Sequence, residues 1–140
     1  MYNAIEIAKY LINLKFTEGS PINNNKVQML LYLVQGQSYR LYGIPVFKEN
    51  FYAWKQGPVI PDVYWTYSGY LNVPIRRKYD ISLNERTKRI IEDILSRTDN
   101  FNENTLRNII CEKDSTWAWF NGTSSEKISK KHLKKYFKSL

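Results

Sequence analysis

The feature that most constrains the fold is a run of apolar residues at helical spacing between Asn23 and Gly43. The positions that share one face at this spacing are Val27, Leu30, Leu31, Val34, Ser38 and Leu41. This periodicity predicts a long helix that begins near Asn23 or Asn24 and packs the face inward. Glycine is the commonest residue just after a helix, so Gly43 predicts where it ends.

Capping signals and apolar stripes predict further helices around this one. Asn3 is a plausible N-cap with Glu6 as its capping-box acid, and Ser82 with Glu85 forms a second capping box. Pro61 suits a first helical turn. The expected helices are one over 4–14, one from Pro61 through Trp65 and Tyr67, one from Ser82 to about Leu95, one over 103–110, a turn or two around Trp117, Trp119 and Phe120 before Gly122, and a last one after Ser129.

Two short β-prone segments, residues 45–47 and 51–54, are separated by the polar residues 48–50. They predict a small hairpin or two extended strands. The expected fold class is therefore mainly α: a compact single domain over 1–140, with about six helices and one small β-hairpin or short two-stranded element. The basic C-terminal helix, 127–140, is expected to be part of that domain.

Composition favours a folded protein of the cytoplasm. The chain has 140 residues with 43% hydrophobic and 15% aromatic side chains, enough for a core. No segment approaches the roughly 20 apolar residues that span a bilayer. The first residues lack the pattern of a signal peptide, and one cysteine, Cys111, agrees with a reducing compartment. We expect no membrane association.

The sequence offers no catalytic or metal-binding constellation, so we expect a binding protein without a cofactor and not an enzyme. Cys111 and His132 are the only cysteine and histidine, too few for zinc. Cys111 follows two isoleucines, which favours a buried structural thiol, and His132 lies among lysines, which favours a solvated surface residue. No glycine-rich phosphate loop is present, and the carboxylates are scattered.

Aromatic residues concentrate between positions 51 and 70, and they are the first candidate binding surface. They are Phe51, Tyr52, Trp54, Tyr64, Trp65, Tyr67 and Tyr70. Large aromatic side chains are preferred at the centres of protein interfaces, but they also fill cores. The four from Tyr64 to Tyr70 cannot all face one side of a helix, so we expect a minority to be exposed.

The net charge of +8 raises a second candidate, an acidic partner or nucleic acid. Residues 76–78 are all basic, and the C-terminal segment is rich in lysine. Lys127, Lys131, Lys134 and Lys138 are the candidate nucleic-acid-binding residues on its outer face. A plain solvated face explains the same lysines, as does an AT-rich genome, so both interpretations stay open.

Three segments together resemble one known family. Residues 25–36 (NKVQMLLYLVQG) are similar to the lysine–hydrophobic–glutamine–x–leucine–leucine–tyrosine helix of the Panacea domain, the SocA-like antitoxin family. Residues 41–47 (LYGIPVF) are similar to its glycine–x–proline–leucine–phenylalanine strand. Residues 53–64 (AWKQGPVIPDVY) resemble its most specific signature. Trp117 and the closing Ile128, Tyr136 and Phe137 are similar to weaker landmarks, so the resemblance extends over nearly the whole chain.

The resemblance implies a prophage or toxin–antitoxin protein that neutralises a toxin, encoded by an adjacent gene, by direct contact. It also implies a Clp-type protease as a further partner, to which the toxin is delivered. The contact residues that we expect are Gln28, Gln35, Trp54, Lys55, Tyr64 and Trp65. Gln28 and Gln35 are seven residues apart and share one helix face, where we expect exposed amides.

One departure from the family pattern limits what carries over. The family has a threonine–histidine pair and a proline before the late tryptophan, where this chain has Cys111-Glu112 and Thr116. No role of that histidine is carried over. The alternatives to an antitoxin are a nucleic-acid-binding regulator that uses the C-terminal lysines and a phage-encoded inhibitor of a host defence protein.

Overall fold

The computed structural model describes residues 1–112, 114–120 and 125–140, and the fold is mainly α with a small sheet, as predicted. The described elements are α1 (Ala4–Thr17), α2 (Asn24–Tyr42), β1 (Tyr52–Trp54), β2 (Gly57–Val59), α3 (Pro61–Thr66), the 3-10 helix η1 (Ser68–Tyr70), α4 (Glu85–Thr98), α5 (Glu103–Ile110), α6 (Thr116–Trp119), β3 (Glu126–Lys127) and α7 (Lys130–Lys138). The described residues thus form seven α-helices, whereas about six were expected. Gly122, expected to follow α6, and the side chain of Trp119 lie outside the described residues.

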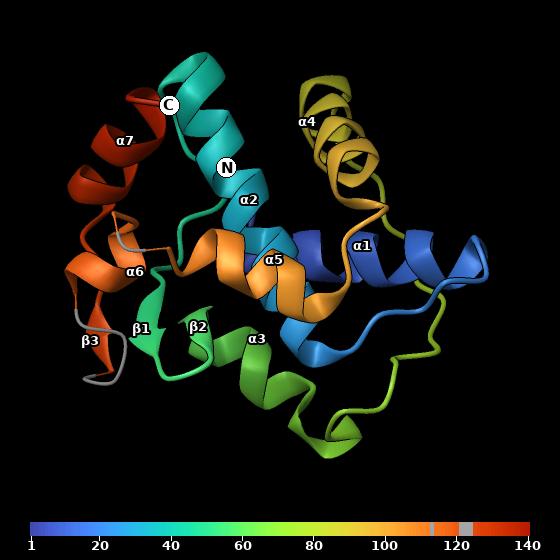
Figure 1. Cartoon of the computed structure of the whole chain (residues 1–140). Coiled ribbons are helices and arrows are strands. Elements are labelled where there is room, and N and C mark those ends of the chain that lie inside the picture. The colour runs from blue at the N-terminus through green and yellow to red at the C-terminus, as the bar shows by residue number, and fades with distance from the viewer. Residues whose placement is uncertain (113, 121–124) are drawn as a thin grey trace.

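Helix α2 is the central element, because every other long helix packs against it. Helices α1 and α4 contact it on one side and α7 on the other, as Figure 1 shows. Its limits confirm the sequence-based prediction. The Asn23 side chain accepts a hydrogen bond from the Lys26 backbone, and Gly43 closes the helix in the left-handed conformation, at φ 72°.

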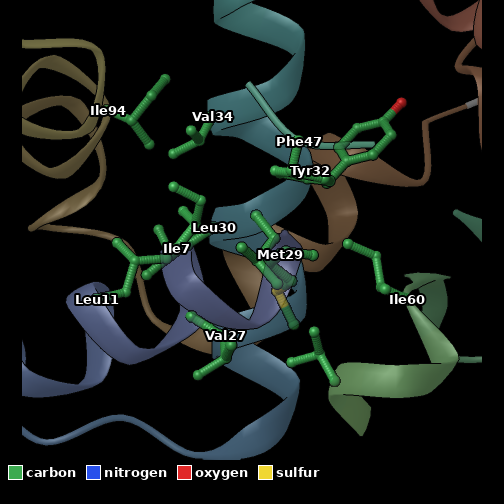
Figure 2. Packing of buried hydrophobic residues seen from close by; sticks show 14 of the residues in the cluster. Ile7, Leu11, Val27, Met29, Leu30, Tyr32, Val34, Phe47, Ile60 and Ile94 are labelled. Atoms are coloured by element: carbon green, nitrogen blue, oxygen red, sulfur yellow. The ribbon is translucent and has the colours of Figure 1, made fainter. Parts of the chain in front are cut away.

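The core lies where the apolar faces of α1, α2 and α4 meet. Figure 2 shows one cluster that joins Ile7 and Leu11 of α1, Leu30 and Val34 of α2, and Ile94 of α4, and all are buried. The inward face of α2 is confirmed except at Leu41, which is exposed. Leu41 and Tyr42 in the last turn of α2 are both exposed, so the apolar periodicity continues past the buried core.

The small sheet differs from the expected hairpin. Strand β1 pairs antiparallel with β2 and, on its other edge, with β3, giving the order β2-β1-β3. Residues 45–47 are not part of it. The Tyr2 backbone instead donates to the Val46 carbonyl at 3.0 Å, and Phe47 forms a parallel bridge with Tyr2. The prediction paired neighbours in sequence, whereas the N-terminus occupies this segment.

Helix starts were predicted well with one exception. The Asn3 backbone donates to the Glu6 carboxylate at 3.1 Å, as the capping box required, and Ser129 caps α7. Ser82 does not cap α4. The Asn84 side chain accepts from the Thr87 backbone instead, so α4 begins two residues later than predicted. Helix α1 continues to Thr17, three residues past its expected end.

Candidate functional site: an aromatic surface held by buried amides

Three aromatic side chains from β1 and α3 form one cluster at the surface. The ring centroids of Trp54 and Tyr64 are 5.1 Å apart, those of Tyr64 and Trp65 5.3 Å, and those of Trp54 and Trp65 6.0 Å. Trp65 is 63% exposed, and the other two are half-buried. Edge-to-face and tilted contacts of this kind are favourable and fix the rings relative to one another. We call Trp54, Tyr64 and Trp65 the ring cluster.

Local structure explains how the sequence brings these rings together. Strands β1 and β2 are joined by the two residues Lys55 and Gln56, and Gly57 directly after them has a φ of 132°, which side-chain-bearing residues rarely adopt. Helix α3 then starts at Pro61, whose fixed φ suits a first helical position. Trp54 at the end of β1 therefore lies beside the tyrosine and tryptophan of α3. Lys55 follows Trp54 in the hairpin turn and is exposed.

Gln28 does not lie on this surface, and the expectation of an exposed amide there is wrong. Its side chain is 2% exposed. Its oxygen accepts from the Ile60 backbone at 2.9 Å, and its nitrogen donates to the Asn24 side chain at 3.2 Å. Asn24 in turn donates to the Tyr64 carbonyl at 3.0 Å. This chain of amides attaches both ends of the first turn of α3, and so the ring cluster, to α2.

Gln35 is also buried, at 1% exposure, so the expectation of an exposed amide at this position is wrong as well. Its oxygen accepts from the Val46 backbone at 2.8 Å and the Phe47 backbone at 3.3 Å, and its nitrogen donates to the Phe47 carbonyl at 2.9 Å. The Gln35 side chain thus makes the hydrogen bonds that a neighbouring strand would otherwise make with the backbone of residues 46–47. Buried backbone groups need partners, and both glutamines supply them from α2.

Two residues that the sequence did not single out as site residues complete the support of the ring cluster. Asn24 was predicted only as a helix start, although its spacing of four residues from Gln28 is typical of paired amides on one helix face. Trp117 of α6 donates its indole N–H to the Trp54 carbonyl at 2.6 Å. No sequence signal connects Trp117 to Trp54, because they are far apart in the chain and meet only in the fold.

The candidate nucleic-acid-binding lysines lie on β3 and α7, and all four are exposed. In the described parts of the chain none is in an ion pair. The ammonium groups of Lys134 and Lys138 lie within 4 Å of where a Cβ of Gly43 would be, at the C-terminal end of α2. Cations are favourable at that end of a helix dipole, so a structural role accounts for these two.

The positions that depart from the family pattern attach the segment around α6 to α2 and to α7. The hydroxyls of Thr116 and the buried Tyr32 form a hydrogen bond, and Tyr136 of α7 donates to the Glu112 carboxylate at 3.0 Å. Cys111 is half-buried, less than predicted. Burial raises the pKa of its thiol to about 11, so it is protonated and weakly nucleophilic at neutral pH.

In one cavity the charged side chains have partners within the chain. The cavity of about 520 Å³ between α1, α2, α4 and α5 contains Lys15, which pairs with Glu18 at 3.1 Å and Asp99 at 3.5 Å. Lys26 in the same cavity donates to the Phe101 carbonyl at 3.2 Å, and burial lowers its pKa. Across residues 1–112, 114–120 and 125–140, no three histidine, cysteine or acidic side chains gather as a metal site would require.

His132 is half-buried and not simply solvated, with its ring edge-to-face against Phe120 at 5.3 Å. Burial lowers the pKa of its imidazole. Among the described helices, none is both long and apolar enough to cross a membrane.

Comparison with known proteins places this arrangement in a family. The model of the family described as "Antitoxin SocA-like, Panacea domain" matches residues 27–118, about two thirds of the chain. The match runs from α2 through α6 and includes the ring cluster, whereas α1 and α7 lie outside it. The searches of curated proteins and of solved structures give no significant match. The helix, strand and hairpin that resembled this family in sequence all fall in the matched region or overlap it, and the chain belongs to the antitoxin SocA-like, Panacea domain family.

Proposed function

We propose that this protein is an antitoxin that binds a toxin encoded by an adjacent gene and neutralises it by direct contact through the ring cluster. Membership of the family supports an antitoxin-type role. The observation that carries the proposed contact is Trp65, a large indole that is 63% exposed yet held against Trp54 and Tyr64. The interaction takes place in the cytoplasm.

A few residues contribute most of the binding free energy of a typical protein interface. Exposed aromatic side chains bury much area when they enter a partner's pocket, and they are enriched among residues whose loss weakens binding most. Binding also loses free energy when mobile side chains are ordered. The ring cluster is already ordered by its own contacts and by the amides of Asn24 and Gln28 beneath it. A rigid aromatic surface of this kind is suited to tight binding.

The test is rescue of growth in cells that co-express this chain with the product of the adjacent gene. We expect the unaltered chain to relieve toxicity. We expect Trp65→Ala to weaken the complex by about 2 kcal/mol, roughly 30-fold in Kd. Leu140→Ala is the matched control, because Leu140 is equally exposed and lies at the C-terminus. Calorimetric titration of the purified pair gives the two affinities.

Stability must be measured beside affinity. Trp65 is mostly exposed, so Trp65→Ala should unfold at nearly the same urea concentration as the unaltered chain. If Trp65→Ala binds the toxin with normal affinity, the ring cluster is not part of the interface. Failure of the unaltered chain to relieve toxicity would contradict the antitoxin role itself.

The same cells separate simple inhibition from delivery to a protease. If the antitoxin also acts as an adaptor, the toxin level falls on co-expression and recovers in a strain that lacks Clp-type proteases. If it acts by contact alone, the toxin level stays constant while growth is restored. We expect contact to be sufficient, with a purified toxin inhibited in the absence of any protease.

A further inference from the structure

The turn after η1 holds a leucine in a backbone conformation that suits glycine. The Val73 backbone donates to the Tyr70 carbonyl at 3.0 Å, which closes a four-residue turn. Leu71, its first central residue, has φ 55° and ψ −126°. These angles define a type II′ turn, whose first central position is normally glycine because a Cβ is strained there. Leucine at this position therefore lowers the stability of the turn, which raises the question of what its side chain contributes.

The side chains of this turn are exposed, while its base is firmly attached. Leu71 is 76% exposed and Val73 57%. On either side, Tyr67 and Ile75 are buried, and the Ile75 backbone donates to the Ile22 carbonyl at 2.8 Å. The turn therefore presents two aliphatic side chains to solvent from a fixed position, and little further ordering is needed for them to bind.

A basic segment follows the turn directly. Arg76, Arg77 and Lys78 are all exposed, and within the described residues none forms an ion pair. The Arg77 guanidinium lies 5.2 Å from the centroid of the Tyr79 ring, which orients it. An apolar tip beside unpaired positive charge is complementary to an apolar pocket with an acidic rim.

We propose that the Leu71 loop, residues 70–78, inserts Leu71 and Val73 into an apolar pocket of the toxin whose rim carries carboxylates that meet Arg76 and Lys78. This inference rests on the proposed function and adds a second contact of the same partner. The loop follows α3, the helix that carries Tyr64 and Trp65, so one continuous segment supplies both contacts. In this proposal the contact that Leu71 makes with the toxin offsets the strain of its backbone.

The decisive variant is Leu71→Gly, which removes the side chain and relieves the backbone strain together. We expect its unfolding temperature to rise by about 3 °C and its affinity for the purified product of the adjacent gene to fall roughly 10-fold. Few substitutions stabilise a protein while weakening its binding, so the two results together identify a contact residue. Asparagine also tolerates positive φ in such turns. The variant Leu71→Asn should therefore lose affinity without the added backbone flexibility of glycine. Ile109→Ala on α5 is the exposed aliphatic control.

The outcomes separate this inference from the proposed function. If Trp65→Ala loses affinity and Leu71→Gly binds as the unaltered chain does, the Leu71 loop is not a contact, but the ring cluster is. If the unaltered chain binds no toxin, both proposals fail. A lower unfolding temperature for Leu71→Gly would overturn the strain argument.

Charge and the nature of the partner are tested separately. Arg76→Glu together with Lys78→Glu should slow association several-fold at low salt, with a smaller effect at high salt. Co-sedimentation with phosphatidylserine vesicles, lost in Leu71→Gly, would assign the loop to a lipid surface and overturn the proposal. Absence of vesicle binding supports a protein partner.

Discussion

The ring cluster and the lysine-rich face of α7 are both exposed surfaces, but they are attached to the same helix, α2, in different ways. The ring cluster is attached through directional hydrogen bonds. The side chains of Gln28 and Asn24 bind the backbone at Ile60 and Tyr64, and so hold α3. Helix α7 is attached to α2 by close apolar packing. The Phe137 ring lies over Gly36, where any side chain on α2 would overlap it, and edge-to-face against Tyr32 at 5.3 Å.

The difference supports the proposal that the ring cluster, and not the lysine-rich face of α7, is the binding surface. Hydrogen bonds fix both the position and the orientation of a segment, and here they hold the backbone of α3, the helix that carries Trp65. Apolar contact at Phe137 fixes where α7 lies, while Lys127 and Lys131 remain exposed and only Lys134 and Lys138 lie near the end of α2. A rigid aromatic surface suits specific binding, whereas exposed lysines suit solubility or non-specific attraction.

The largest expected effect comes from breaking the apolar packing of α7 on α2. Phe137→Ala should lower the free energy of unfolding by about 3 kcal/mol, because it removes a buried ring and leaves a cavity above Gly36. Urea unfolding followed by tryptophan fluorescence measures the loss. Lys135→Ala, two residues earlier and exposed, is the control and should change stability by less than about 0.5 kcal/mol. Equal losses in the two variants would mean that α7 is not held by this ring.

Breaking the hydrogen-bonded attachment should have a smaller effect on stability and a clear effect on binding. Gln28→Met keeps the volume but leaves the Ile60 N–H and the Asn24 oxygen without partners, at about 2 kcal/mol. Because α3 is then held less firmly, affinity for the toxin should fall as well. Gln56→Met is the matched control, since Gln56 is half-buried and its side chain forms no hydrogen bond within the described residues. Unchanged affinity with reduced stability would show that the amides support the fold but not the binding surface.

The smallest expected effect concerns the basic face. Replacing Lys127, Lys131, Lys134 and Lys138 by glutamine should lower stability by about 1 kcal/mol at most, through the loss of Lys134 and Lys138 at the end of α2, and leave growth rescue intact. Gel shifts with duplex DNA and with RNA at physiological salt give the second measurement. Strong, salt-dependent binding that is lost in this variant would favour the nucleic-acid-binding alternative over the antitoxin role.

Much of the fold was readable from local sequence. Periodicity placed α2, and the capping box at Asn3 placed the start of α1, because these signals depend on neighbours within one helical turn. The errors arose where distant segments compete for the same backbone groups. Residues 45–47 were expected to pair with 51–54, but Gln35 and Tyr2 occupy their hydrogen bonds instead.

The candidate site was predicted in part for the same reason. Trp54, Lys55, Tyr64 and Trp65 were selected from composition and from the family resemblance, and the structure places the three aromatic residues among them in one cluster. Gln28 and Gln35 were wrongly expected at the surface. A polar residue beside an apolar stripe is usually solvated, and only the loops that fold over α2 at Ile60 and Val46 bury it.

The sequence by itself determined the central helix, the mainly α class and the family, because helical periodicity and short motifs are properties of neighbouring residues. Only the tertiary structure decided which aromatic residue faces solvent, which amides are buried, and that Leu71 stands strained at the tip of an exposed turn. Exposure is set by what covers a residue, and the covering segments here come from other parts of the chain.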